Sequence, residues 1–216
     1  MNAAGHEGKR LAILETAARL FKEHGFHRVG ISDIAAALNV TKPSIYYYVG
    51  NKEEMLVRIR QLAAARLSEG LPELFASDRT GIELLEHVLL RYGEWATSDV
   101  GQCALRLIRT QLSPKNAAKL REVERSFEHQ VKLIFDRGMA DGTIKPCNPS
   151  MVQMVLFGAL NWLAFWYDPE RASLDKNEIS RLFAEVLLQG IAGERTSSRV
   201  PLSPLTAGLR PSETTR

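Results

Sequence analysis

Cysteines are few in this chain, and it has no long uninterrupted apolar segment. The two cysteines, Cys103 and Cys147, show neither a CxxC spacing nor a neighbouring histidine cluster, which argues against a disulfide framework and against a zinc site. The longest apolar stretch, residues 151–167, contains Gln153 and Asn161 and is shorter than the roughly 20 residues that span a bilayer. Residues 1–10 lack the apolar core of a signal peptide. We therefore expect a cytoplasmic protein with no membrane partner.

Sequence patterns typical of catalysis are also missing. The chain has no Ser/His/Asp spacing, no glycine-rich phosphate loop and no paired carboxylates, which are common signs of an active site. Glu83 and His87 lie one helical turn apart, but no second pair of ligands accompanies them. An exposed contact between the two is therefore favoured over a metal site. We expect no catalytic residue, no metal and no cofactor.

The strict alternation of apolar and polar residues that a half-buried strand requires is absent. Apolar residues instead recur at helical spacing from residue 9 to residue 193, which predicts an all-α fold of about nine helices. The expected helices are one that ends at Gly25, two short ones around residues 34–38 and 41–49, a fourth over residues 51–70, and five more at about residues 80–97, 102–111, 115–140, 149–167 and 174–191.

The length of 216 residues suits one small domain and one medium domain. We place the first at residues 1–50 and the second, a helical bundle, at residues 51–193. Residues 194–216 are rich in serine, threonine and proline and have little to bury, so we expect a disordered tail. The formal charge of +3 equals the excess of basic over acidic residues within residues 1–60. A small basic excess is also common on solvated surfaces, so charge alone does not identify a nucleic-acid partner.

Two short helices joined through residues 39–40, with a longer helix before them, form the pattern of a helix-turn-helix. In that motif the second short helix enters the major groove of DNA. Here it starts at Thr41, whose hydroxyl can cap it, and it carries Lys42 and three consecutive tyrosines at residues 46–48. A folding helix does not need these groups, but they can reach phosphates and base edges. The third tyrosine, Tyr48, fits either a DNA contact or packing against the neighbouring helices.

The N-terminal segment resembles the TetR family of bacterial transcription regulators. The similarity lies in HGF at residues 24–26, ISDIA at 31–35, VTKPSIYYYV at 40–49 and NKEEML at 51–56, and it is specific through about Arg58. The resemblance implies phosphate binding by Lys52, contact of Thr41 with the DNA backbone, and base or phosphate contacts by Ser32, Lys42, Pro43, Ser44, Tyr46 and Tyr47. At Val29 and Gly30 the chain departs from the Thr or Ser usual in the family, which puts a hydroxyl contact with phosphate there in doubt. Tyr48 completes the candidate DNA-binding set.

Two C-terminal segments are candidates for a dimer interface. Residues 149–167 are apolar on nearly every side, with Gly158 and Ala159 allowing another helix to approach. Residues 174–191 carry an apolar stripe. Together the two segments suit a two-fold interface of four helices in a homodimer, although an unusually thick monomer core is an alternative. A two-fold dimer predicts a near-palindromic operator, because identical recognition helices must enter successive major grooves on one face of the duplex.

A second resemblance concerns the ligand. FGALNW at residues 157–162 and WYDP at 166–169 are similar to the eighth helix of TetR-type regulators of fatty-acid degradation, which implies an acyl-coenzyme A thioester as effector. An acyl chain requires an apolar slot between helices, and the coenzyme's phosphates require arginines at its opening. The alternative is that the tryptophans are core residues and the arginines are solvated. The candidate ligand-binding residues are Leu105, Leu107, Trp162 and Phe165 for the acyl chain, and Arg106 and Arg109 for the phosphates.

These patterns predict a ligand-responsive repressor that leaves a palindromic operator when the effector binds. The main alternative is an all-α enzyme or cofactor-binding bundle whose N-terminal three-helix unit is merely structural, and the triple tyrosine and Lys52 argue against it. A second alternative is a regulator with no small-molecule ligand, controlled by its expression level or by a protein partner.

Overall fold

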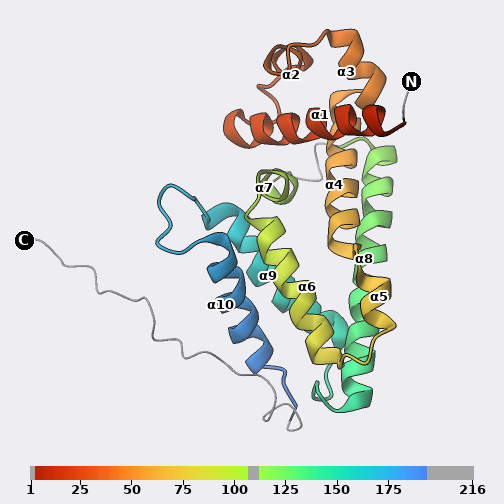
Figure 1. Cartoon of the computed structure of the whole chain (residues 1–216), viewed down its shortest axis with the longest axis vertical. Helices are drawn as coiled ribbons and strands as arrows, with labels where there is room; N and C mark the ends of the chain where they lie inside the picture. The colour runs from red at the N-terminus through yellow and green to blue at the C-terminus, as the bar shows by residue number, and fades with distance from the viewer. Residues whose placement is uncertain (1–2, 107–111, 194–216) are drawn as a thin grey trace, which may run out of the picture.

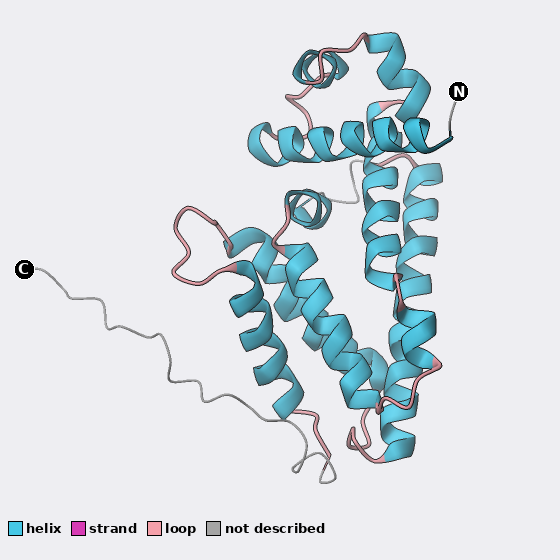
Figure 2. Ribbon diagram, in the orientation of Figure 1, coloured by secondary structure: helices cyan, strands magenta, loops and turns pink. Residues whose placement is uncertain are grey.

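A computed structural model of the chain describes residues 3–106 and 112–193 (Figure 1). These residues form ten α-helices and no β-strand beyond a single bridge between Ile144 and Ala192 (Figure 2), so the all-α class expected from the sequence is confirmed. Leu107, Arg109 and the expected tail at residues 194–216 lie outside the described residues. The helices are α1 (Ala3–His24), α2 (Ile31–Ala37), α3 (Lys42–Val49), α4 (Lys52–Ser68), α5 (Leu71–Phe75), α6 (Gly81–Ala96), α7 (Asp99–Arg106), α8 (Pro114–Asp141), α9 (Pro149–Trp166) and α10 (Lys176–Gln189).

The short helix α5 is the one element that the sequence did not predict. It begins directly after Gly70 and has Pro72 in its first turn, where a missing proline N–H costs nothing. The sequence therefore indicated a break at this place, and the structure inserts a helix of five residues into it.

Helices α1, α2 and α3 form a small unit at one end of the molecule (Figure 1). Phe21, Ile34, Ile45 and Val49 are buried between them. α2 and α3 are joined through Asn39, which has a φ of 52°, a left-handed conformation that asparagine tolerates better than most residues. The turn at Asn39 thus sets the angle between the two short helices.

Helix α4 leads directly from this unit into the larger bundle. Asn51 caps it, because Asn51 Oδ1 accepts a hydrogen bond from the Glu54 backbone N–H at 2.9 Å. In return, Glu54 Oε2 accepts one from the Asn51 backbone N–H at 3.2 Å, and this reciprocal pair fixes where the helix starts. α4 then runs beside α8 (Figure 1). A movement of α4 against α8 would therefore reorient the N-terminal unit.

The larger bundle, α4 to α10, has its own core, in which Leu85, Phe135 and Leu160 are completely buried. α6 passes α8 with Gly81 against Gly138, so closely that a Cβ added to Gly81 would overlap the backbone of Gly138. Glycine at both positions permits this approach. Within the part of the chain that the structure describes, none of the helices combines the length and the hydropathy needed to cross a bilayer.

Candidate DNA-binding surface and effector cavity

Helix α3 has one buried side and one exposed side. Ile45 and Val49 are fully buried, whereas Tyr46 is 53% exposed and Tyr47 is 66% exposed. Two neighbouring tyrosines exposed on one helix are available to contact a partner through ring and hydroxyl. The other candidate DNA-contacting residues of α2 and α3 are exposed or, for Ser44, half-buried, and they are Ser32, Thr41, Lys42, Pro43 and Ser44.

Tyr48 differs from the two tyrosines before it. It is half-buried, and its ring lies 4.7 Å from the His6 ring and 5.1 Å from the Tyr47 ring, measured between centroids. His6 belongs to α1, so Tyr48 packs against the first helix of the unit. Of the two interpretations left open by the sequence, the packing one has a direct structural basis.

Lys52, expected to bind phosphate, makes contacts within the protein. Its Nζ lies 4.4 Å from the centroid of the Phe26 ring and donates a hydrogen bond to the His27 carbonyl at 3.4 Å. Burial lowers the pKa of Lys52, and the nearby Asp33 carboxylate opposes that shift. Lys52 therefore holds the start of α4 against the loop between α1 and α2, and its phosphate contact remains a prediction.

Glu53 joins α4 to the first turn of α8. Its carboxylate accepts hydrogen bonds from the Ser113 backbone N–H and hydroxyl, both at 2.7 Å, and from Asn116 Nδ2 at 2.5 Å. The hydrogen bond from the Ser113 hydroxyl, followed by those from Asn116 and the Ser113 backbone, lowers the pKa of Glu53. Sequence reasoning missed this contact, because nothing local relates residues that lie 60 positions apart.

The N-terminal unit is tied to the bundle at two further places. Lys22 of α1 donates a hydrogen bond to the Asp99 carboxylate at the start of α7, at 2.6 Å. Arg66 of α4 does the same to Glu15 of α1 at 2.8 Å. Both pairs are at least partly exposed, so each contributes little stability. They fix an orientation more than they strengthen the fold.

A cavity of about 1030 Å³, here called the inner cavity, lies between α4, α6, α8 and α9. Its size is typical of a site for a small organic ligand. Aromatic and aliphatic side chains form much of its lining, and they include Leu67, Tyr92, Trp95, Leu105, Leu120, Phe127, Met154, Phe157 and Phe165.

The inner cavity also has polar groups. Tyr92 donates its hydroxyl proton to Asn161 Oδ1 at 2.5 Å, and burial raises the pKa of Tyr92, which keeps the phenol neutral. Arg60 and Glu124, which line the cavity as well, form an ion pair at 3.9 Å. Trp95 Nε1 is buried and has no hydrogen-bond acceptor among the described residues. A buried donor without an acceptor is unusual in a native protein.

The residues predicted to bind the ligand fall into three groups. Leu105 and Phe165 line the inner cavity. Arg106 does not: its Nε donates to the Ala164 carbonyl at 2.7 Å, and it lines a separate depression of about 560 Å³ together with Lys22 and Phe165. Trp162 is 64% exposed and lines neither hollow. Leu107 and Arg109 lie outside the described residues.

Sequence reasoning also missed several residues of the inner cavity. Tyr92 and Trp95 come from α6 and Phe127 comes from α8, whereas the predicted set drew only on residues 105–109 and 162–165. The aromatic side chains at helical spacing on α6 could have indicated a ligand cavity, but the same pattern is equally typical of an ordinary hydrophobic core.

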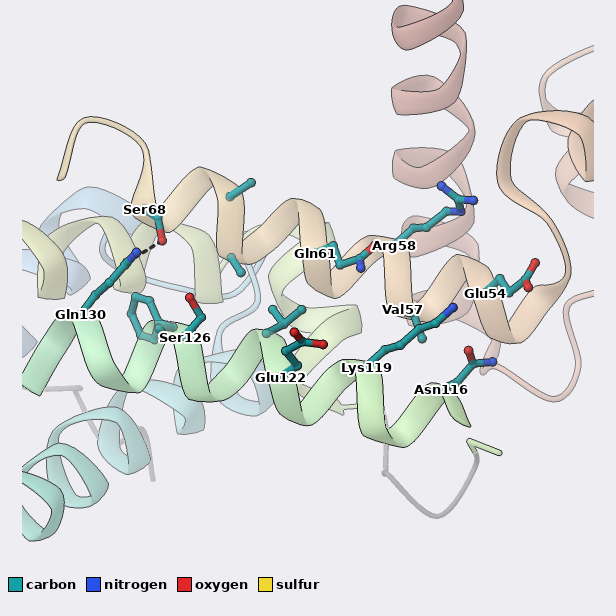
Figure 3. A pocket seen from close by; sticks show the side chains of 14 residues that line it. Glu54, Val57, Arg58, Gln61, Ser68, Asn116, Lys119, Glu122, Ser126 and Gln130 are labelled. Atoms are coloured by element: carbon teal, nitrogen blue, oxygen red, sulfur yellow. Dashed lines mark hydrogen bonds between the residues drawn. The ribbon is translucent and has the colours of Figure 1, made fainter. Parts of the chain in front are cut away.

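A second hollow of about 920 Å³, the outer groove, runs between α4 and α8 (Figure 3). Most of the residues that line it are polar or charged: among the neutral ones, Gln61 and Ser68 come from α4, and Gln130 comes from α8. Ser68 Oγ donates a hydrogen bond to Gln130 Oε1 at 2.8 Å across the groove. Three residues, Ala64, Val123 and Phe127, line both the outer groove and the inner cavity.

The exposed face of α9 is strongly apolar. Met151, Val155, Trp162 and Trp166 recur at helical spacing and are each more than half exposed. Val186 of α10 is 56% exposed. Gly158, on the same helix as the tryptophans, has open space where a Cβ would lie. An exposed apolar face of this kind is typical of an interaction surface.

The chain was compared with known proteins. Residues 13–59 match the family model described as bacterial regulatory proteins, tetR family, and residues 78–191 match the Tetracyclin repressor-like, C-terminal domain. The Fatty acid metabolism regulator protein of Bacillus subtilis is 23% identical over 189 residues, which cover 85% of this chain and 95% of the relative.

Solved structures show the same fold. A TetR family transcriptional regulator, PfmR, from Thermus thermophilus superposes with a TM-score of 0.71 at 25% identity, covering 82% of this chain and 97% of that one. AibR in complex with isovaleryl coenzyme A and operator DNA superposes with a TM-score of 0.69 at 22% identity, covering 84% and 97%. Both family models match, and the structure has the helix-turn-helix unit and the helical bundle that they describe. We conclude that the chain belongs to the TetR family of DNA-binding transcription regulators.

Proposed function

We propose that the protein is a homodimeric repressor that leaves a near-palindromic operator when an acyl-coenzyme A thioester binds in the inner cavity. One observation carries this proposal. The cavity is bounded by α4, and only two residues separate the end of the recognition helix α3 from the start of α4. A molecule that changes the packing of α4 therefore changes the position of the DNA-contacting unit.

The DNA-binding part of the proposal assigns residues 1–50 to the DNA-contacting domain and residues 51–193 to effector binding and dimerisation. The exposed Tyr46 and Tyr47 hydroxyls and the Lys42 ammonium would contact base edges and phosphates in the major groove. The backbone N–H of Lys42 at the start of α3 would add a phosphate contact, whereas Pro43 has no N–H and the Ser44 N–H donates to the Thr41 carbonyl.

The dimer would form through the exposed apolar face of α9 together with α10. Removing apolar surface from water is favourable by roughly 25 cal/mol per Å², so covering several large apolar side chains on this face would stabilise a dimer. A two-fold axis would cover this face on both subunits with the same residues.

The choice of effector rests on the chemistry of the inner cavity and on the relatives. The cavity is lined by aromatic and aliphatic groups, and an acyl chain would bury apolar surface there. A thioester carbonyl is a hydrogen-bond acceptor, which the buried Trp95 Nε1 lacks. The Bacillus subtilis relative is described as a fatty acid metabolism regulator, and AibR was solved with isovaleryl coenzyme A.

Release of DNA requires that the effector binds the non-DNA-binding conformation more tightly than the DNA-binding one, since equal affinity would shift nothing. The test is a calorimetric titration of the purified dimer with acyl-coenzyme A thioesters of increasing chain length and with the matching free acids. In parallel, an electrophoretic shift assay uses DNA from upstream of the protein's own gene. We expect thioester binding and concentration-dependent release of the DNA. Binding of no thioester would refute the effector, and failure to shift any upstream DNA above non-specific competitor would refute the repressor.

A further inference from the structure

We propose that the polar arm of the effector leaves the inner cavity between α4 and α8 and lies in the outer groove, with its anionic end beside Arg58 and Lys119. This inference rests on the proposed function, because it assumes an effector with an apolar tail in the inner cavity. It assigns the coenzyme part of the ligand to a surface that the sequence did not indicate, in place of Arg106 and Arg109.

The geometry that points to this route is the thin boundary between the two hollows. Ala64, Val123 and Phe127 line both of them. On α4 the boundary falls in a run of three alanines, of which Ala63 lines the inner cavity and Ala65 lines the outer groove. Small side chains on one of the two helices leave room for a narrow chain to pass after a modest shift of Phe127.

The outer groove suits an arm that contains amide groups. Gln61, Ser68, Ser126 and Gln130 line it with neutral donors and acceptors (Figure 3). The pantetheine arm of coenzyme A carries two amides, which such side chains can hydrogen-bond. The depression that contains Arg106 is a weaker alternative, since the Arg106 Nε is already bonded to the Ala164 carbonyl.

Charges along the groove orient the arm. Arg58 and Lys119 lie toward the end nearest the N-terminal unit, near Asn116 (Figure 3), and they offer cationic partners for phosphates. Two carboxylates also line the groove. That of Glu54 is engaged in the cap of α4, whereas that of Glu122 is exposed and opposes an anionic ligand. Removing the charge of Glu122 should therefore strengthen binding of the full thioester.

The same route explains how the effector would act on DNA binding. Asn116 lines the outer groove and donates to Glu53, which ties α4 to the first turn of α8. An arm inserted between the two helices would separate them next to this contact. The bound effector would thereby favour a conformation in which α4, and the recognition helix attached to it, has moved away from α8.

The test compares two ligands on four forms of the full-length protein. Dodecanoyl-coenzyme A carries the complete arm, and S-dodecanoyl-N-acetylcysteamine carries the same acyl thioester with most of the arm removed. The proteins are the wild type, the double variant Arg58→Ala/Lys119→Ala, Glu122→Gln, and Arg121→Ala. Arg121 is exposed on α8, does not line the outer groove, and serves as the matched control for loss of a cationic side chain. Dissociation constants are measured by calorimetry at one fixed ionic strength.

We expect the wild type to bind the complete thioester at least about tenfold more tightly than the truncated one. The double variant should lose most of that tenfold difference while binding the truncated thioester as the wild type does, and Glu122→Gln should increase the difference. Arg121→Ala should behave as the wild type. Equal binding of the complete thioester by the wild type and the double variant would overturn the route through the outer groove while leaving the proposed effector intact. If neither thioester binds the wild type, the proposed effector and the route both fail.

A second variant tests the passage itself. Ala64→Leu places three more carbon atoms at the boundary, and we expect it to reduce the preference for the complete thioester by about tenfold. Ala118→Leu, on the exposed side of α8, is the matched control and should keep the preference. Circular dichroism and thermal unfolding identify a variant that has failed to fold, in which case Ala64→Val takes its place. An unchanged preference in a folded Ala64 variant would contradict passage between α4 and α8.

Discussion

At the scale of single residues, the three consecutive tyrosines of α3 have different environments. Tyr46 and Tyr47 are exposed, whereas Tyr48 is half-buried. The His6 ring of α1 lies 4.7 Å from the Tyr48 ring and 5.7 Å from the Tyr47 ring, measured between centroids. The helical period explains the difference. Tyr48 lies three residues after the buried Ile45 and so shares its side of the helix, whereas Tyr46 and Tyr47 lie on the side that faces solvent. Three residues of one chemical type therefore have at least two roles.

Tyr46→Ala tests the exposed role. We expect it to weaken specific operator binding by about 1–3 kcal/mol, which is the value of one good side-chain contact in the groove, and to leave thermal unfolding nearly unchanged because the side chain is 53% exposed. Fluorescence anisotropy with operator DNA at fixed salt measures the affinity. A variant that binds its operator as tightly as the wild type would show that Tyr46 does not contact DNA.

Glu53→Gln tests the link between α4 and α8 by its dependence on pH. The pKa of the Glu53 carboxyl is lowered, first by the Ser113 hydroxyl. A lowered pKa means that the carboxylate contributes stability at pH values above its unfolded-state pKa of about 4.3, and that this contribution is lost as the pH falls through the folded-state pKa. We expect Glu53→Gln to lower the free energy of unfolding by about 1 kcal/mol at pH 7, since solvent screens this carboxylate.

The difference between wild type and Glu53→Gln should shrink as the pH falls below about 4.3. Urea unfolding at a series of pH values from neutral to acid measures it. Glu73→Gln, at an exposed position of α5, is the control and should differ little from the wild type at any pH. A Glu53→Gln effect that stays constant over the whole series would mean that the charge is not what stabilises the contact.

At the scale of helices, α6 approaches α8 closely at Gly81 and Gly138. A Cβ on Gly81 would overlap the Gly138 backbone and come within 2.9 Å of the Ile134 carbonyl oxygen. Backbone cannot move aside as a flexible side chain can, so we expect Gly81→Ala to lower the free energy of unfolding by about 1–3 kcal/mol or more. Gly8→Ala is the control, because Gly8 lies within α1 with open space around it, where alanine should stabilise the helix by up to about 1 kcal/mol. Chemical denaturation measures the free energy of unfolding of both variants. Equal stability of Gly81→Ala and the wild type would contradict the close approach.

Helix α9 has two different sides. Phe157 and Asn161 face the inner cavity, while Val155 and Trp162 are more than 60% exposed. One helix would therefore contact the effector on one side and the partner subunit on the other. In the proposed dimer, this arrangement would make the interface sensitive to what occupies the cavity.

Val155→Asp tests the interface. A charge on this apolar face would have to be buried without a partner in the dimer, which costs several kcal/mol, so we expect monomers at concentrations where the wild type is dimeric. Leu133→Asp is the matched control, because Leu133 is an exposed leucine of α8, 45% exposed, and should leave the dimer intact. Light scattering gives the mass of each. A wild type that stays monomeric at all concentrations, or a dimeric Val155→Asp, would place the interface elsewhere.

At the scale of the whole molecule, two subunits related by a two-fold axis would present two α3 helices to one face of the duplex. The half-sites must then be separated by a whole number of helical turns, about 10 base pairs each. Inserting about 5 base pairs between the half-sites rotates one by half a turn to the opposite face. We expect this insertion to abolish specific binding and an insertion of a full turn to restore part of it. The electrophoretic shift assay compares the three operators, and equal binding to all three would rule out rigid two-fold recognition.

The sequence by itself determined the parts of this protein that depend on local chemistry. Helical spacing of apolar residues predicted the all-α fold, and two short helices joined through residues 39–40, with a longer helix before them, predicted the helix-turn-helix. These features involve residues within one or two turns of each other, so the backbone and neighbouring side chains suffice to specify them. The exposure of Tyr46 and Tyr47 also agrees with the expected recognition helix, although their contacts with DNA remain predictions.

Only the tertiary structure decided which helix faces meet. It joined Glu53 to Ser113 and Tyr92 to Asn161, contacts that span 60 and 69 positions in the sequence. It also placed Phe165, which is 53% exposed, at the lining of the inner cavity, whereas Trp162 on the same helix does not line it. The physical reason is that the period of a helix fixes which residues share a face, whereas the crossing angles and the register between distant helices fix what that face contacts. Those angles result from packing the whole core at once, which no local pattern encodes.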